Sequence, residues 1–134
     1  MAESPDLYVL DTHALYWYWS DPGRLGEGAA GVFRALERQE ATGIVSVVVI
    51  AEMHYLTAKA LRPASVADLL NRVDSAASLR LEPLDRRQML AFGQVESVPE
   101  MHDRLIAAVA LMHDAPLVSR DGVLRGHPTL RVIW

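Results

Sequence analysis

The sequence predicts an α/β fold built on an open, mostly parallel sheet with helices on both faces. Short apolar runs typical of buried strands alternate along the chain with longer segments of helical periodicity. With 134 residues, 51% hydrophobic and 22% charged, the chain is long enough to bury a core and too apolar to be disordered. We therefore expect residues 1–134 to form one domain.

Two strands and four helices are expected in the first half of the chain. The strands are Leu7–Leu10 and Gly43–Val45, and the helices are Thr12–Trp19, Gly28–Glu40, Val47–Ala60 and 66–76. Leu7–Leu10 is a continuous apolar run, the form of a strand buried on both faces, and Gly28–Glu40 has amphipathic helical spacing. Thr12–Trp19 is apolar almost all round, which predicts a short buried helix. Ser46 and Ser65 precede the next two helices as N-terminal caps.

Three strands and two helices are expected in the second half. The strands are Leu79–Leu84, Leu117–Ser119 and Leu130–Trp134. One helix begins after its cap Asp85 and ends before Pro99, and the other covers His102–His113. Asp121 and Gly122 are expected to close the fourth strand as a turn.

The composition excludes several classes of protein. The absence of cysteine excludes a disulfide framework, a thiolate zinc site and a thiol nucleophile. No apolar run is long enough to span a bilayer and the first six residues lack the features of a signal peptide, so a cytoplasmic protein without a membrane partner is expected. Residues 26–31 satisfy the glycine pattern of a dinucleotide-binding site. A turn precedes them where that site requires a strand, so the pattern does not indicate dinucleotide binding. The net charge of −4 disfavours a nucleic-acid partner unless clustered acids bind cations.

Four acidic residues are the candidate site. Asp11 follows the first strand, Asp121 follows the fourth, and Asp103 opens a helix at the same edge, where parallel sheets bind ligands. Glu52 lies inside an apolar helix, where a carboxylate is costly without a partner. Clustered carboxylates repel one another unless they bind cations, and all-oxygen sites suit Mg²⁺ or Mn²⁺. Such ions activate water for phosphodiester hydrolysis.

Four segments, in this order, resemble a known family. They are L-D-T-H-A-L at 10–15, Ser46 with Glu52 six residues later, D-R-L-I-A-A at 103–108 and L-V-S-R-D at 117–121. The whole chain resembles PIN-domain ribonucleases, and among them the VapC-type toxins of toxin–antitoxin pairs. The resemblance implies an α/β/α sandwich with a five-stranded sheet and Mg²⁺- or Mn²⁺-dependent endoribonuclease activity on RNA. It also implies that Asp11, Glu52, Asp103 and Asp121 bind the metal, that the protein is a homodimer, and that a cognate antitoxin inserts its tail into the active-site groove.

Residues beside the acids have two interpretations each. Thr12 and Ser119 either hydrogen-bond a metal ligand or cap a helix, and Arg104 and Arg120 either hold phosphate or pair with a carboxylate. The stretch Tyr16–Trp19 suits core packing with subunit contact, or stacking on an RNA base. The chain departs from the family in reading E-M-H-D-R at 100–104 where relatives commonly have D-P-F-D-R, which leaves a metal role for Glu100 open.

Two other functions are considered. An α/β phosphotransfer or dehalogenase-like enzyme would use Asp11 as its nucleophile, but His13 occupies the position of the second Asp that dehalogenase-like enzymes carry. Receiver domains need a lysine near a late strand, whereas the sole lysine is Lys59. A catalytically silent PIN-like binding module is the remaining alternative, and the complete set of four acids argues against it.

Overall fold

Five parallel strands form one sheet in the computed structural model, which describes residues 6–59 and 63–134. The strands are β1 (Asp6–Leu10), β2 (Ala41–Ser46), β3 (Leu79–Glu82), β4 (Leu117–Val118) and β5 (Val132–Ile133). Their order in the sheet is β3-β2-β1-β4-β5, and every neighbouring pair is parallel. The predicted α/β class and the five-stranded sheet are therefore confirmed.

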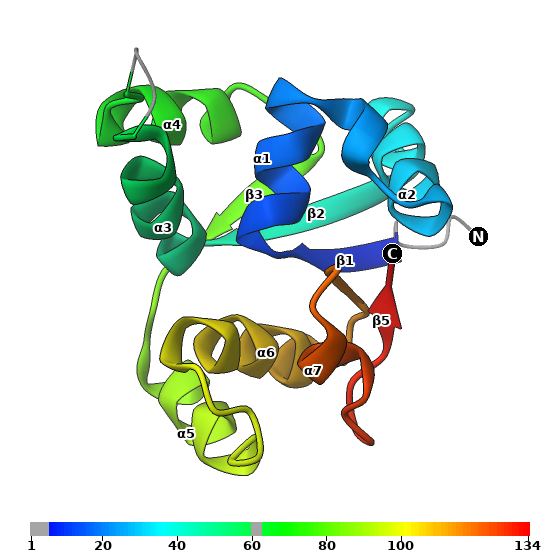
Figure 1. The fold of residues 1–134 in the computed structure, drawn as a ribbon, viewed down its shortest axis with the longest axis vertical. Helices are drawn as coiled ribbons and strands as arrows, with labels where there is room; N and C mark the ends of the chain where they lie inside the picture. The colour runs from blue at the N-terminus through cyan, green and yellow to red at the C-terminus, as the bar shows by residue number, and fades with distance from the viewer. Residues whose placement is uncertain (1–5, 60–62) are drawn as a thin grey trace, which may run out of the picture.

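Helices cover both faces of this sheet (Figure 1). They are α1 (Thr12–Ser20), α2 (Glu27–Glu37), α3 (Val47–Thr57), α4 (Val66–Asp74), α5 (Arg86–Gln94), α6 (Met101–His113) and α7 (Gly122–Arg125), with a 3₁₀ turn at Pro22–Arg24. Figure 1 shows α1 to α4 on one face and α5 to α7 on the other. Right-handed crossovers explain this division, because the chain first moves from β1 outward to β3 and then returns across the sheet to β4.

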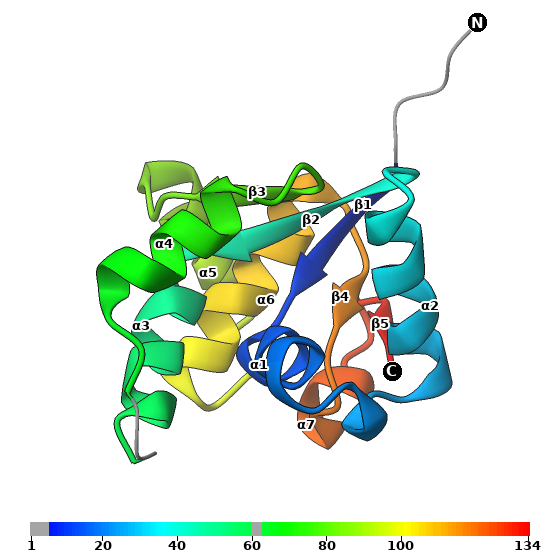
Figure 2. The same cartoon turned by 90° about the horizontal axis from the view of Figure 1, so that it is seen from above.

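The return crossover creates a switch point between β1 and β4, which lie side by side in Figure 2. Leu10 pairs in register with Val118, so both strands end at the same level. The chain leaves β1 into α1 on one face of the sheet and leaves β4 towards α7 on the other. Open α/β sheets bind ligands in the crevice outside such a point. Asp11 and Asp121 both follow strands that border it.

The helix starts follow the expected capping chemistry. Side-chain oxygens accept hydrogen bonds from backbone N–H groups in the first turns of α1, α3, α4 and α5, and the capping residues are Asp11, Ser46, Ser65 and Asp85. Such caps satisfy N–H groups that a helix leaves without internal partners. The core is apolar, with Val9, Leu10 and Ile106 at 0 to 1% exposure packed between the sheet and its helices.

Three expectations need correction. Helix α1 is not buried all round, because Ala14 and Leu15 are buried while Tyr16–Trp19 are only half-buried. Asp121 does not simply close a turn, because it caps the short helix α7. The last strand is shorter than expected and covers only Val132–Ile133.

Two further expectations fall on the undescribed parts of the chain. The expected end of the third helix at Ala60 lies outside the described residues, as do Met1–Pro5. Over the described ranges, none of the helices combines the length and hydropathy needed to cross a bilayer.

Candidate active site

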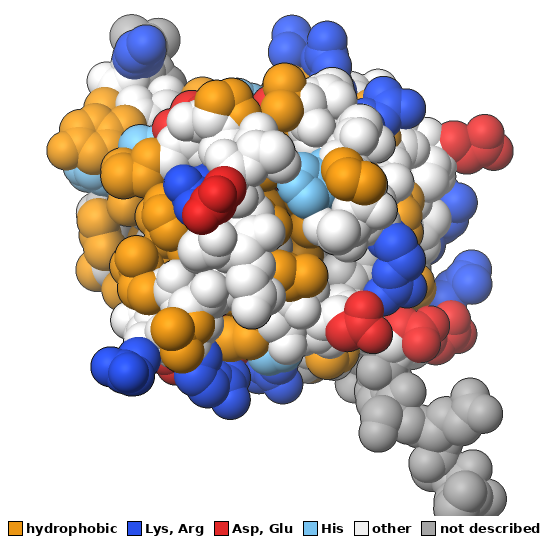
Figure 3. Space-filling model, turned by 90° about the horizontal axis from the view of Figure 1, so that it is seen from below, with side chains coloured by type: hydrophobic (Ala, Val, Ile, Leu, Met, Phe, Trp, Pro, Cys, Tyr) orange, Lys and Arg blue, Asp and Glu red, His pale blue; other side chains and the backbone are white. Residues whose placement is uncertain are grey.

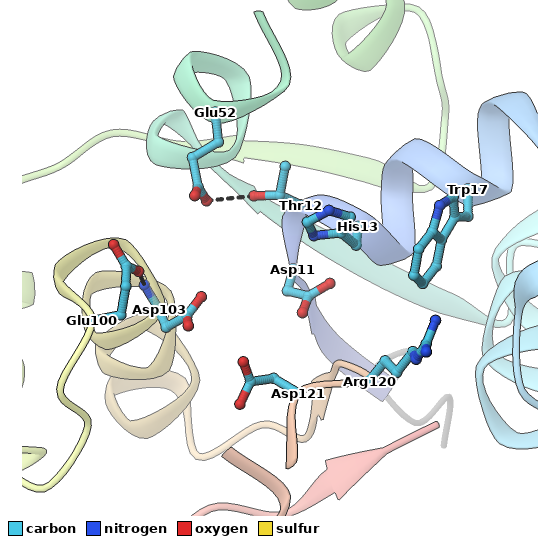
Figure 4. A pocket seen from close by; sticks show the side chains of 9 residues that line it. All are labelled: Asp11, Thr12, His13, Trp17, Glu52, Glu100, Asp103, Arg120 and Asp121. Carbon is cyan, nitrogen blue, oxygen red and sulfur yellow. Dashed lines mark hydrogen bonds between the residues drawn. The ribbon is translucent and has the colours of Figure 1, made fainter. Parts of the chain in front are cut away.

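A pocket of about 460 Å³ opens where β1, α3, α6 and the segment after β4 meet. We call it the acidic pocket, and Figure 4 shows the side chains that line it, which are Asp11, Thr12, His13, Trp17, Glu52, Glu100, Asp103, Arg120 and Asp121. The structure thus brings all four predicted acids to one pocket. In Figure 4 Asp11, Asp103 and Asp121 surround one open space, which Glu52 faces from α3.

Asp11 is fixed by the start of α1 and by the adjoining strand. Its Oδ1 accepts a 2.9 Å hydrogen bond from the Ala14 N–H, and its own N–H donates to the Val118 carbonyl at 3.1 Å. The side chain is 9% exposed. Burial raises the pKa of Asp11, and the nearby Glu52 charge adds to the rise, while hydrogen bonding by Ser119 and Ala14 opposes it. A bound cation would remove the cost of this buried charge.

Glu52 has a specific hydrogen-bond partner across the pocket. The Thr12 hydroxyl donates to Glu52 Oε1 at 2.6 Å, which links α1 to α3 (Figure 4). Thr12 is buried, at 4% exposure, so this contact is sheltered from water. One oxygen of Glu52 is thus held in place, and the carboxylate keeps a second oxygen with which to bind a ligand.

Asp103 lies in the first turn of α6, a helix that Glu100 caps. Glu100 caps α6, with its Oε2 accepting from the Asp103 N–H at 2.7 Å and its Oε1 contacting His102 Nδ1 at 2.7 Å. Partial burial acts to raise the pKa of Glu100, but these hydrogen bonds outweigh it and lower the pKa. Glu100 therefore caps α6 and also lines the acidic pocket.

Asp103 itself carries the clearest electrostatic signature of the pocket. Burial and the repulsion of Asp121, Glu100, Glu52 and Asp11, in that order, raise the pKa of Asp103 to about 6. The carboxylates from four separate segments are therefore close enough to disfavour one another's ionised forms. Perturbed carboxylates of this kind gather at functional sites.

Asp121 and Ser119 form a small turn after β4. The Ser119 hydroxyl oxygen accepts from the Asp121 N–H at 3.1 Å, and Asp121 Oδ1 accepts from the N–H groups of Val123 and Leu124. Ser119 is fully buried behind the pocket and does not line it. Ser119 does not cap a helix, because the cap of α7 is Asp121, and its hydrogen bonding to Asp11 lowers the pKa of that carboxyl.

The two arginines beside the acids differ. Arg120 lines the acidic pocket, with its guanidinium carbon 5.4 Å from the centre of the Trp17 ring, and within residues 6–59 and 63–134 it forms no ion pair. Arg104 points elsewhere, because its Nε donates to the Phe92 carbonyl at 2.9 Å and its guanidinium lies 3.9 Å from the Phe92 ring centre. Of the two arginines, therefore, only Arg120 lines the acidic pocket, whereas Arg104 joins α6 to α5.

Two aromatic lining residues received no firm role from the sequence. His13 is exposed and its ring lies 5.3 Å from that of Trp17, which in turn packs edge-on against Trp134 at 5.7 Å. His13 and Trp17 lie four residues apart on α1, so they share one face of that helix. Because α1 begins directly after Asp11, this shared face was a signal in the sequence that could have placed both rings at the pocket.

The chemistry of the donors fits a hard divalent cation. The four acids offer carboxylate oxygens, the ligands that Mg²⁺ and Mn²⁺ prefer, and no cysteine competes. Among the residues that the structure describes, no group of three or more His, Asp or Glu side chains is already arranged to hold an ion. Burial first, and then the repulsion of the other acids, raises the pKa of Asp103, and a bound cation would offset both.

Solved structures share the fold along nearly the whole chain. VapBC2 of Rickettsia felis, in a structure with a promoter DNA fragment, aligns at 19% identity and a TM-score of 0.71, covering 94% of this chain and 96% of that one. VapBC of Salmonella typhimurium bound to DNA aligns at 18% identity and a TM-score of 0.69, covering 95% of this chain and 96% of that one. FitAcB of Neisseria gonorrhoeae aligns at 20% identity and a TM-score of 0.67, covering 93% of this chain and 95% of that one. These neighbours are proteins of VapBC and FitAB toxin–antitoxin complexes. A comparison with curated protein sequences gives no match.

The family itself is identified by a sequence model. The model described as the PIN domain matches residues 8–128, which include all four acids of the acidic pocket. The match agrees with the parallel sheet and with the resemblance of the four sequence segments. This chain belongs to the PIN domain family.

Proposed function

We propose that this protein is a Mg²⁺- or Mn²⁺-dependent endoribonuclease that hydrolyses phosphodiester bonds in RNA. The observation that carries the proposal is the acidic pocket, where Asp11, Glu52, Asp103 and Asp121 from four separate segments line one cavity at the switch point of the sheet. Arg120 on the same wall supplies the cation that a phosphate needs beside so many acids.

Residues in and behind the acidic pocket have distinct parts in this chemistry. Asp11, Asp103, Asp121 and Glu52 would hold the metal, which when bound would activate water and stabilise charge on the phosphate. Thr12 orients Glu52, and Ser119 orients the turn that carries Asp121. Arg120 would contact a phosphate oxygen. Removing any of the acids would change both the charge and the shape of the pocket.

The biological role that we propose is that of the toxin in a VapBC-type toxin–antitoxin pair. The support is the likeness of fold to proteins crystallised as VapBC and FitAB complexes, together with the family match. A cognate antitoxin would then bind this chain and restrain it. An RNA substrate and an antitoxin made in the same cell imply action in the cytoplasm.

We also propose a homodimer, on the evidence of an exposed apolar surface. Figure 3 shows hydrophobic side chains gathered on one side of the face formed by α5 and α6. The exposed apolar side chains on or next to these helices are Leu84, Met89, Leu90 and Met101. Large exposed apolar patches commonly mark interfaces. Light scattering should give twice the chain mass of 14.8 kDa.

The deciding experiment is RNA cleavage by the purified protein with Mg²⁺ or Mn²⁺, with and without EDTA. Metal-dependent cleavage that EDTA abolishes is expected. A phosphoryl group trapped covalently on Asp11 would instead support the phosphotransfer alternative, which needs a nucleophilic carboxylate. Binding of RNA without cleavage in any metal would support the silent binding module. Mapping the 5′ ends of cellular RNA after induction would then identify the target.

A further inference from the structure

A second pocket opens beside the acidic pocket and shares one wall with it. It measures about 470 Å³, and both pockets are lined by Thr12, His13 and Glu52. The rest of its lining includes Tyr55, Leu56, Lys59 and His102. We call it the Tyr55 pocket. A molecule bound at the carboxylates can therefore extend into it across a shared boundary.

The α3 helix and its end supply one continuous edge of both pockets. Tyr55 and Leu56 lie three and four residues after Glu52 in α3, the spacing that places side chains on one side of a helix, and Lys59 follows just past the end of the helix. The chemistry changes along this line from an acid, through apolar and aromatic groups, to the only lysine of the sequence. Such a gradient matches the change from phosphate chemistry at the metal to a base and then to the next phosphate.

Tyr55 has the form of a stacking platform. Its side chain is the most exposed of the large hydrophobic residues in the described chain, at 73%. The ring meets that of His54 edge-on at 5.6 Å, and His54 Nδ1 lies 3.1 Å from the Ala64 carbonyl, which anchors that neighbour. An aromatic ring supported at its edge keeps its face for a planar ligand.

We propose that the Tyr55 pocket binds a nucleobase of single-stranded RNA next to the phosphate held at the acidic pocket, with the base stacked on Tyr55 and Lys59 contacting the following phosphate. This inference rests on the proposed ribonuclease function. Unpaired bases stack on aromatic side chains, whereas bases inside a duplex are already stacked. The pocket therefore selects single-stranded RNA.

Binding without metal tests the stacking contact directly. Fluorescence anisotropy in EDTA would compare a short single-stranded RNA with an RNA of the same length that carries abasic nucleotides. Tyr55→Leu keeps apolar bulk without the ring and is expected to weaken binding of the intact RNA by about 5- to 150-fold, the range of one base stack. Its binding of the abasic RNA should equal that of the wild type. Tyr55→Phe keeps the ring and should bind both RNAs like the wild type.

Lys59 gives an independent readout. Lys59→Gln should weaken binding of the intact and abasic RNAs alike, because its contact is to phosphate, and should make the affinity less dependent on salt by about one counterion. Since Tyr55 and Lys59 are exposed, the variants Tyr55→Leu, Tyr55→Phe and Lys59→Gln should have the melting temperature of the wild type. Unchanged binding of intact RNA by Tyr55→Leu, or equal losses on intact and abasic RNA, would overturn the proposal.

Two further outcomes separate this inference from the proposed function. Wild-type protein that cleaves RNA while Tyr55→Leu binds and cleaves it equally well would reject the Tyr55 pocket alone. Base-dependent RNA binding that requires Tyr55, without cleavage in Mg²⁺ or Mn²⁺, would support the pocket and reject the nuclease. If Tyr55→Leu instead halves the mass of a wild-type dimer with no effect on RNA affinity, the surface is a contact between copies and the proposal fails.

Discussion

The Thr12 hydroxyl donates a 2.6 Å hydrogen bond to Glu52, a residue 40 positions further along the chain. This contact joins the helix after β1 to the helix after β2, on one side of the acidic pocket. It fixes the orientation of a carboxylate that would otherwise choose among several rotamers. In the proposed function Glu52 is a metal ligand, and a group that hydrogen-bonds such a ligand contributes to metal affinity without touching the metal.

Replacing Thr12 tests this positioning role. Thr12→Val has the same shape but no hydroxyl, so we expect Mn²⁺ affinity, measured by calorimetry, to fall by about 10- to 100-fold. Thr12→Ser keeps the donor and should restore most of the affinity. Equal affinities in the Val and Ser variants would show that the hydrogen bond has no role in metal binding.

Asp11→Asn separates activity from stability. Asparagine can still cap α1. The substitution removes the Asp11 carboxyl, whose pKa is raised by burial. RNA cleavage should fall by at least about 100-fold, because the reaction depends on charge and positioning. In EDTA the variant should melt at the same temperature as the wild type or higher, since the cost of burying the charge is gone, together with the smaller repulsion from Glu52.

Asp6→Asn is the matched control, since Asp6 begins the strand that Asp11 follows and lies outside the acidic pocket. It should cleave RNA like the wild type. Full activity in correctly folded Asp11→Asn would mean that the acids have been assigned to the wrong reaction.

The pKa of Asp103 predicts how stability depends on pH without metal. Because that pKa is raised to about 6 from its ordinary value of 3.8, the folded protein binds a proton that the unfolded chain has released in this pH range. The contribution of Asp103 to the free energy of unfolding should therefore be largest below pH 4 and decline as the pH rises through 6. Denaturant melts in EDTA across this range would measure the slope, and Asp103→Asn should flatten it.

Mg²⁺ should reverse this trend. A cation binds the ionised carboxylates and competes with the proton, so the gain in melting temperature on adding Mg²⁺ should be large at pH 8 and small at pH 5. Glu96→Gln, at an exposed acid outside the acidic pocket, should keep the full gain. An equal gain at both pH values would place Mg²⁺ binding away from Asp103.

The sequence predicted the elements that depend on local pattern and topology. Alternating strands and helices predicted the sheet, and the four acids at strand ends and in neighbouring helices were expected to meet at one edge of it, where they line one pocket. It could not predict the direction of a long side chain. Arg104 and Arg120 look equivalent in the sequence, but only the structure shows that Phe92 holds Arg104.

Short-range signals also competed with one another. Asp121 followed by Gly122 has the form of a turn, and the two hydrogen bonds that Asp121 accepts make it a helix cap instead. The aromatic run 16–19 appeared uniformly apolar, yet its rings have different surroundings. Trp17 lines the acidic pocket, while Tyr18 stacks on Phe33 and donates to Glu37. Tertiary packing decides these roles.

Gly26 and Gly28, at the start of α2, leave room for the backbone of Trp134. The Trp134 main-chain oxygen accepts hydrogen bonds from the N–H groups of Gly28 and Ala29, at 2.9 and 3.3 Å, where the helix has no side-chain cap. A Cβ on Gly26 would lie 2.6 Å from the Trp134 backbone. Gly26→Ala must therefore displace Trp134, which packs against Trp17 at the acidic pocket.

We expect Gly26→Ala to lower the free energy of unfolding by about 1 to 3 kcal/mol, the usual cost of forcing atoms into a packed site. Trp fluorescence should change as well, because the Trp17 and Trp134 rings would separate. Gly93→Ala is the control, since Gly93 lies in α5 with nothing within 4 Å of an added Cβ, and there alanine should stabilise the protein by about 0.5 to 1 kcal/mol. Urea melts would measure both variants. If Gly26→Ala were as stable as the wild type, residues 26–28 would not be the docking site of Trp134.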